Sequence, residues 1–94
     1  MKVGTDAVLL GAWVLPNGSK RILDIGTGTG VIALMIAQKS QAHIDAIDID
    51  EDAVLQASQN VLGSKFSEQI LVTKSSLQEY AKTNPQKYNL IVTN

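Results

Sequence analysis

The chain has 94 residues, of which 45% are hydrophobic and 18% charged, and its formal net charge is −1. This composition is typical of one small soluble globular domain and excludes a disordered or fibrous chain. The small negative charge provides no overall basic field of the kind that concentrates nucleic acid, so we expect any RNA contact to be local or to lie outside this chain.

The sequence argues against a metal site and against a membrane-spanning segment. It contains no Cys and one His, His43, which excludes disulfides and thiolate metal sites and makes a zinc cluster improbable. The first apolar run, residues 7–15, is far shorter than the roughly 20 residues that span a bilayer. We therefore expect a cytosolic protein with no metal and no membrane segment. His43 opens a strand, has no visible partner in the sequence and receives no role.

The N-terminal segment predicts a short capped helix and a turn. Thr5 and Asp6 are suitable caps for a helix that continues to residue 14, and the single Trp13 on it is expected to pack in the core. Residues 16–19 (PNGS) then predict a turn.

A strand, a glycine-rich loop and a helix follow. Residues 21–25 (RILDI) predict the first strand, and residues 26–30 are rich in glycine. The helix predicted over residues 31–39 is apolar on most faces, so that even Val31 and Met35 are expected to be buried. Such a helix packs against a sheet.

The second strand and its helix carry the clearest local signals. Residues 43–48 (HIDAID) predict a strand, and residues 51–62 predict a helix whose first two residues are acidic. Asp50 is well placed to cap this helix, and Gly63 to end it.

The remaining elements complete an alternating pattern. The sequence predicts a third strand at residues 69–73, a short helix at 77–82, a turn at Asn84-Pro85 and a fourth strand at 88–93. One helix followed by βαβαβαβ implies an α/β fold with parallel strands, right-handed crossovers and helices flanking the sheet.

The strongest motif is the glycine loop, in which Gly26, Gly28 and Gly30 alternate with Thr between a strand and a helix. Glycines let the backbone turn sharply and approach a ligand, while the amides at the helix N-terminus can donate to a carboxylate or phosphate. A dinucleotide fingerprint would need its third glycine at position 31, where this chain has Val31. A P-loop is excluded because no Lys follows Gly30.

Two acidic residues at strand ends narrow the choice of ligand. Asp24 lies two residues before Gly26, where a carboxylate repels a pyrophosphate but attracts an ammonium group. Asp48 lies about 20 residues past the glycine loop, where an acid can accept hydrogen bonds from both ribose hydroxyls. S-adenosylmethionine carries both groups, and we count Ile49 among its contacts.

Each acid also has a purely structural interpretation. Asp24 could cap the helix or bond to loop amides without binding any ligand. Asp50 is a rival to Asp48 on the same face of the strand, but its place beside the helix favours the capping role.

The pattern Asp24-x-Gly26-x-Gly28-x-Gly30 followed by Asp48 resembles the cofactor site of the class I methyltransferases. The resemblance implies a Rossmann-like fold, of which the chain would contain the N-terminal half, with residues 1–94 forming a partial S-adenosylmethionine-binding domain. Asn94 resembles the start of the Asn-Pro-Pro-Tyr motif, so the sequence is expected to stop inside its catalytic motif.

The segment of residues 2–13 (KVGTDAVLLGAW) resembles the N-terminal cofactor segment of bacterial tRNA valine (adenine-N6) methyltransferases, which modify the adenine 3′ of the anticodon. This resemblance implies a tRNA substrate, cofactor contacts from Thr5 and Asp6, and a catalytic Asn94 that accepts hydrogen bonds from the adenine amine. Asn94 could alternatively be a strand-end Asn that starts a turn.

The sequence departs from this family at Ser76, where many members have an Asp that binds the cofactor adenine. Ser76 and Glu79 read as a capping box, Ser-x-x-Glu, which favours a structural role. Backbone groups at Ser76 and Leu77 are still expected to hold the adenine.

Other functions stay open at this point. A protein glutamine methyltransferase shares the Asn-Pro-Pro-Tyr motif, and a non-catalytic module could bind S-adenosylmethionine or another protein.

Four strands alone would leave the outer edge of the fourth strand, residues 88–93, unpaired. We therefore expect this chain to self-associate through that edge.

Overall fold

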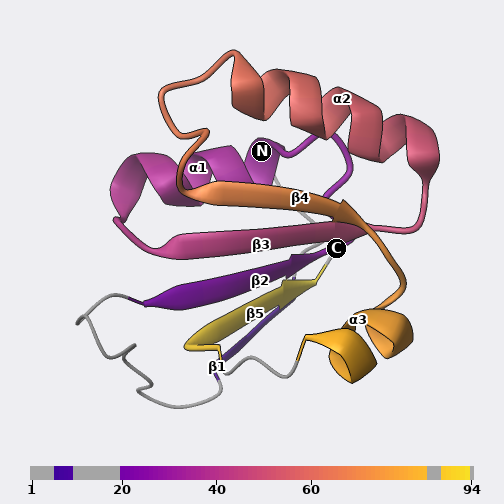
Figure 1. Ribbon diagram of the computed structural model, residues 1–94. Coiled ribbons are helices and arrows are strands. Elements are labelled where there is room, and N and C mark those ends of the chain that lie inside the picture. Colours follow the sequence, from indigo (N-terminus) through magenta and orange to yellow (C-terminus); the bar gives the residue numbers. More distant parts are fainter. Residues whose placement is uncertain (1–5, 10–19, 85–87, 94) are drawn as a thin grey trace.

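The computed structural model describes residues 6–9, 20–84 and 88–93, with the backbone alone for residues 6–9. In chain order its elements are β1 (Asp6–Leu9), β2 (Arg21–Ile25), α1 (Val31–Lys39), β3 (His43–Asp48), α2 (Glu51–Leu62), β4 (Ile70–Lys74), α3 (Leu77–Thr83) and β5 (Leu90–Thr93). The strands form one sheet in the order β1-β5-β2-β3-β4 (Figure 1). Strands β5, β2, β3 and β4 run parallel to their neighbours in this group, which confirms the predicted α/β fold.

Local signals place several elements exactly where the sequence predicts them. Strands β2 and β3 and helices α1 and α2 have the predicted bounds. Asp50 caps α2, because its Oδ2 atom accepts a 2.9 Å hydrogen bond from the Ala53 amide. β4 begins at Ile70, one residue later than predicted, because the Gln69 amide donates to the Phe66 carbonyl in the preceding turn.

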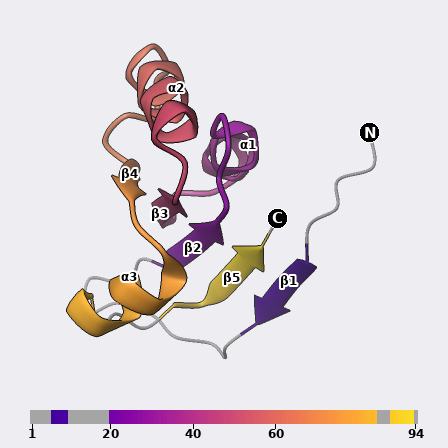
Figure 2. The same cartoon turned by 90° about the vertical axis from the view of Figure 1, so that its right-hand side faces the viewer.

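The predictions at one edge of the sheet are wrong. Residues 6–9, expected in a helix, form β1, which pairs antiparallel with β5 from Asp6↔Thr93 to Leu9↔Leu90. β1 therefore covers the edge of β5 that was expected to be unpaired, and the outer strands of the described sheet are β1 and β4 (Figure 2). The sequence DAVL is too short to show a helical or a strand period, so pairing with β5 decides its structure. The rest of the predicted helix, with Trp13, lies outside the described residues.

β5 also begins two residues later than predicted, at Leu90. Before it, the Asn89 amide donates to the Arg21 carbonyl, and the Arg21 amide donates to the Asn89 side-chain oxygen, both at 2.8 Å. The Asn89 side chain thus takes the acceptor role that a backbone carbonyl would have in a regular ladder.

The helices divide between the two faces of the sheet: α1 and α2 cover one face and α3 lies on the other (Figure 2). The main core lies under α1 and α2, where Ala33 and Ala37 of α1 are buried against the sheet. Val31 and Met35, expected to be buried, are 46% and 44% exposed because a helix on a sheet turns only one side toward it. No helix in the described part of the chain is long and apolar enough to cross a membrane.

Candidate functional site

The three glycines of the loop after β2 all adopt left-handed backbone conformations. Their φ angles are 73° at Gly26, 59° at Gly28 and 85° at Gly30, a region that L-residues with a side chain rarely occupy. A Cβ atom at Gly28 would meet no described atom within 4 Å, whereas one at Gly30 would contact Ala57 of α2. A Cβ atom at Gly30 would thus pack against α2 at ordinary contact distance, and open space lies beside Gly28.

Most amides of the loop are already bonded within the protein. The Gly26 and Thr27 amides donate to the Ile47 carbonyl at 2.9 and 3.0 Å, and the Gly30 amide donates to the Thr27 carbonyl. Asn60 of α2 donates its side-chain amide to the Thr29 carbonyl. These contacts hold the loop rigidly over the end of β3. Helix α1 has no side-chain cap, so its first-turn amides are the donors left for a ligand.

Asp24 is fully buried at the base of the loop and is bonded through only one of its oxygens. Its Oδ2 atom accepts a 2.8 Å hydrogen bond from the Thr27 hydroxyl, while Oδ1 has no partner among the described residues. Burial raises the pKa of Asp24; the Thr27 hydrogen bond opposes the rise, and the nearby Asp48 adds to it. A buried carboxylate oxygen without a donor fits a cationic or hydrogen-bonding group brought by a ligand.

Asp48 and Asp50 make different contacts in the structure, and Asp50 has its predicted capping role. Asp48 Oδ2 accepts from the Gly28 amide and its Oδ1 from the Asp50 amide, both at 2.9 Å. Asp50 caps α2 instead and is exposed. Asp48 thus joins the end of β3 to the glycine loop, and each of its oxygens keeps a second lone pair for another donor.

A pocket of about 400 Å³ opens beside Asp48, lined by Ile49, Lys74, Ser75, Ser76 and Glu79. It brings together Ile49 and Ser76, both predicted as ligand contacts. Ser75 was not predicted; its amide donates to the Asp48 carbonyl at 2.9 Å, which holds the turn after β4 against the end of β3. The predicted Leu77 is 43% exposed at the start of α3.

Ser76 has the structural role that the sequence favours. Its hydroxyl oxygen accepts a 3.1 Å hydrogen bond from the Glu79 amide, which caps α3. The hydroxyl keeps its own hydrogen as a donor, while the Ser76 carbonyl already accepts a 2.8 Å hydrogen bond from the Ser75 hydroxyl.

The predicted residues at the two ends of the chain are only partly described. Thr5 and Asn94 lie outside the described residues, and for Asp6 the structure gives the backbone alone. The pairing registers Asp6↔Thr93 and Thr93↔Ile25 nevertheless place the Asp6 backbone at the same sheet edge as the glycine loop. This is the carboxyl edge of the parallel strands, where open α/β sheets bind their ligands.

A second buried polar cluster, not predicted from the sequence, lies on the α3 face of the sheet. Asp45 accepts hydrogen bonds from Arg21 Nη1 at 3.0 Å and from the Tyr88 hydroxyl at 2.8 Å. The Tyr88 and Tyr80 hydroxyls lie 3.2 Å apart, and burial raises the pKa of both phenols. The sequence signal was present, because Asp45 lies among the apolar residues Ile44, Ala46 and Ile47 of β3. In the described part of the chain, no three His, Cys, Asp or Glu side chains converge as metal ligands.

Comparisons with known proteins identify relatives that are named as tRNA methyltransferases. A tRNA1(Val) (adenine(37)-N6)-methyltransferase from Parabacteroides distasonis is 58% identical over 94 residues, which cover all of this chain and 40% of that protein. The enzyme of the same name from Trichodesmium erythraeum is 50% identical over 97 residues, covering 41% of its length. The chain therefore spans about two fifths of the length of these relatives.

A solved structure and a family model also match this chain. M. capricolum TrmK, in complex with S-adenosyl-homocysteine, matches with a TM-score of 0.64 and 28% identity over 74% of this chain and 31% of that one. The family model described as "Methyltransferase small domain" matches residues 3–94. The chain belongs to the methyltransferase small domain family.

Proposed function

We propose that this chain is the cofactor-binding part of an S-adenosylmethionine-dependent methyltransferase that modifies N6 of adenine in tRNA, 3′ of the anticodon, in the cytoplasm. The observation that carries the cofactor assignment is Asp24 Oδ1, a buried carboxylate oxygen at the base of the glycine loop that has no partner among the described residues. The names of the relatives at 58% and 50% identity support the tRNA substrate.

The described residues fit S-adenosylmethionine. Asp24 Oδ1 suits the ammonium group of its amino acid moiety, since a charge-assisted hydrogen bond would satisfy the buried oxygen. The remaining lone pairs of Asp48 suit the ribose hydroxyls, and the pocket beside Ile49 and Ser76 suits the adenine. The open space beside Gly28 lets the ligand approach the backbone. When bound, the cofactor would supply the methyl group as a sulfonium.

The contribution of the chain to catalysis would be binding and orientation. The loop is held by Asn60, Asp48 and the Ile47 carbonyl before any ligand arrives, so little ordering is needed on binding. By resemblance, Asn94 would accept hydrogen bonds from the adenine amine and place its nitrogen in line with the methyl group. Thr5 and Asp6 would contact the cofactor from the N-terminal side. Methyl transfer is mainly a matter of such orientation and charge placement.

The substrate site would lie largely outside this chain. The chain spans about two fifths of its relatives and has a net charge of −1, which provides no basic field for RNA. We therefore expect the isolated 94 residues to bind the cofactor and to transfer no methyl group. Labelled methyl appearing in tRNA after incubation with this chain alone would contradict the second expectation.

Calorimetric titration with S-adenosylmethionine tests the assignment, with NADH as the comparison ligand. We expect saturable binding of S-adenosylmethionine alone and about tenfold weaker binding by Asp48→Ala, which removes acceptors for the ribose. Asp50→Ala is the matched control, because it removes the cap of α2 and leaves the Asp48 oxygens in place. Equal affinity for both ligands, or none for S-adenosylmethionine in a folded chain, would overturn the proposal.

A further inference from the structure

We propose that two copies of this chain associate through the outer edge of β4, in antiparallel register, so that two sheets join across a two-fold axis. This interface is distinct from the edge of β5, which β1 covers. The proposal is argued from the backbone and charges of β4 and does not rest on the proposed function, and Lys74 at the end of this edge also lines the pocket beside Ile49 and Ser76.

The backbone of β4 has hydrogen-bonding groups available on its outer side. The Ile44 amide donates to the Gln69 carbonyl, and the Ser75 amide donates to the Asp48 carbonyl. Since peptide groups alternate along a strand, the odd-numbered residues of β4 face β3 and the peptide groups of Val72 and Lys74 face outward. An edge strand with such groups is a template for pairing with another chain.

Apolar surface lies directly beside this edge. A groove of about 230 Å³ between α2 and β4 is lined by Ser58, Val61, Leu62, Ser67, Ile70, Leu71 and Val72. Leu55, Ser58 and Leu62 share one side of α2 by their i, i+3, i+7 spacing. Leu55, Leu62 and Leu71 are 59%, 76% and 56% exposed. Pairing at β4 would bury this surface together with the strand edge.

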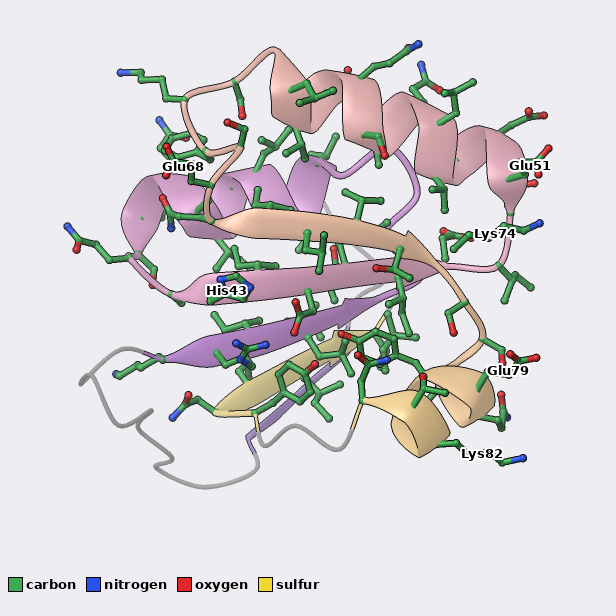
Figure 3. All side chains as sticks on the ribbon, viewed as in Figure 1. His43, Glu51, Glu68, Lys74, Glu79 and Lys82 are labelled. Carbon is green, nitrogen blue, oxygen red and sulfur yellow. The ribbon has the colours of Figure 1, made fainter. Side chains whose placement is uncertain are left out.

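Opposite charges near the two ends of β4 favour pairing with the β4 strand of a second copy, and they favour the antiparallel direction. Glu68, in the turn before β4, and Lys74, at its end, lie at opposite ends of the strand (Figure 3). Antiparallel pairing centred on Leu71 places Glu68 of each copy beside Lys74 of the other, so that the ion pair occurs twice. A parallel arrangement in register would instead place like charges together, which is destabilising.

The charged groups can make these contacts at little cost. Among the described residues, Lys74 forms an ion pair only with Glu51, at 3.5 Å, and both side chains are largely exposed. Glu68 is exposed and has no ion pair or side-chain hydrogen bond in the described part of the chain. An exposed pair such as Lys74–Glu51 is worth little, so its exchange for Glu68 of the second copy is not hindered.

Sedimentation equilibrium of the chain at increasing concentrations tests the proposal. We expect a reversible monomer–dimer equilibrium that weakens with added salt, because two ion pairs contribute to it. Lys74→Glu should weaken dimerisation about tenfold, since it opposes like charges at two places. The double variant Glu68→Lys with Lys74→Glu should restore it. Lys82→Glu on α3 is the matched control, with the same change of charge away from β4 (Figure 3).

Val72→Pro provides a test that does not depend on charge, because proline removes the outward-facing amide of β4. It should leave a folded monomer, as judged by circular dichroism. If that variant unfolds, the charge-swap series still decides the question. A monomeric wild-type chain at all concentrations, or equal effects of Lys74→Glu and Lys82→Glu, would overturn the proposal.

Discussion

The Thr27 hydroxyl donates a 2.8 Å hydrogen bond to Asp24 Oδ2, and the other oxygen of that buried carboxylate has no partner among the described residues. The bond fixes the orientation of the carboxylate, and it favours the ionised form because it donates to the charged group. Thr27 therefore positions Asp24 for the proposed ammonium contact and opposes the rise in its pKa that burial causes.

Replacing Thr27 should change the pH dependence of cofactor binding. Thr27→Val removes the hydrogen bond that opposes the rise in the pKa of Asp24, so this pKa should increase further. Binding that needs the carboxylate should then be lost at a higher pH than in the wild-type chain as the solution is acidified. Thr27→Ser keeps the hydroxyl and is the control. Dissociation constants for S-adenosylmethionine measured across pH test this, and identical profiles for the Val and Ser variants would refute it.

Asp24→Asn should stabilise the chain without ligand at neutral pH, by on the order of 1 kcal/mol. The pKa of Asp24 is raised on folding, so the folded state binds its proton more tightly than the unfolded state does. The ionised carboxylate therefore costs stability above the folded pKa, and this cost disappears as pH falls toward the ordinary value of 3.8. Urea unfolding of both chains from neutral to acidic pH should show the gap closing. A less stable Asn variant at neutral pH would contradict the argument.

Substitutions of Asp48 and Asp50 should cost similar stability but differ in their effect on cofactor binding. Asp48→Asn leaves one oxygen to serve the Gly28 and Asp50 amides, so it should cost about 1 kcal/mol of unfolding free energy and also loosen the loop. Asp50→Ala should cost a similar amount by removing the cap of α2, with little effect on affinity. Amide hydrogen exchange at Gly28 should be faster only in the Asp48 variant. Faster exchange in both would mean that the cap also holds the loop.

Substitutions of the loop glycines should show whether backbone strain or lost ligand contact weakens cofactor binding. Gly28→Ala and Gly30→Ala each force a side chain into a left-handed conformation, at a cost of about 1–2 kcal/mol. The added methyl group faces open space at Gly28 but contacts Ala57 at Gly30. Gly28→Ala alone should therefore weaken binding of S-adenosylmethionine, by about tenfold or more. Thermal unfolding and titration of the two variants provide the comparison, and equal losses of affinity would show that loop strain, not contact, controls binding.

The two tyrosines of the buried cluster around Asp45 should contribute unequally to the free energy of unfolding. Tyr88→Phe removes a donor from a buried carboxylate and should cost about 1–3 kcal/mol. Tyr80→Phe removes the 3.2 Å contact with the Tyr88 hydroxyl, and the 2.8 Å hydrogen bond from Tyr88 to Asp45 remains, so this change should cost less. Denaturant unfolding measures both, and an equal or reversed order would mean that Arg21 alone satisfies Asp45.

The sequence predicts best the parts of this fold whose signals are local. Asp50 and Gly63 bound α2, and the loop of alternating glycines marks the passage from β2 to α1. The acids Asp24 and Asp48 were found because strand ends beside a glycine loop are where such folds bind ligands. Both lie at the loop, as expected.

The features that the sequence did not predict depend on contacts between distant segments. β1 is a strand because it pairs with β5, more than 80 residues later in the chain. The cluster of Asp45 with Arg21 and Tyr88 joins two strands and the segment before a third. Thr27 is close in sequence to Asp24, but only the fold shows that its hydroxyl reaches one oxygen and leaves the other without a partner.

The most direct test of the proposed cofactor site compares two ligands on two chains. S-adenosylmethionine has an ammonium group, and 5′-methylthioadenosine shares its adenosine part but lacks the amino acid moiety. Asp24→Asn should weaken calorimetric binding of the first roughly 10- to 100-fold and leave binding of the second nearly unchanged, because only the first would use the charge on Asp24. Equal losses for both ligands, or no loss for either, would contradict the assignment of Asp24 to the ammonium group.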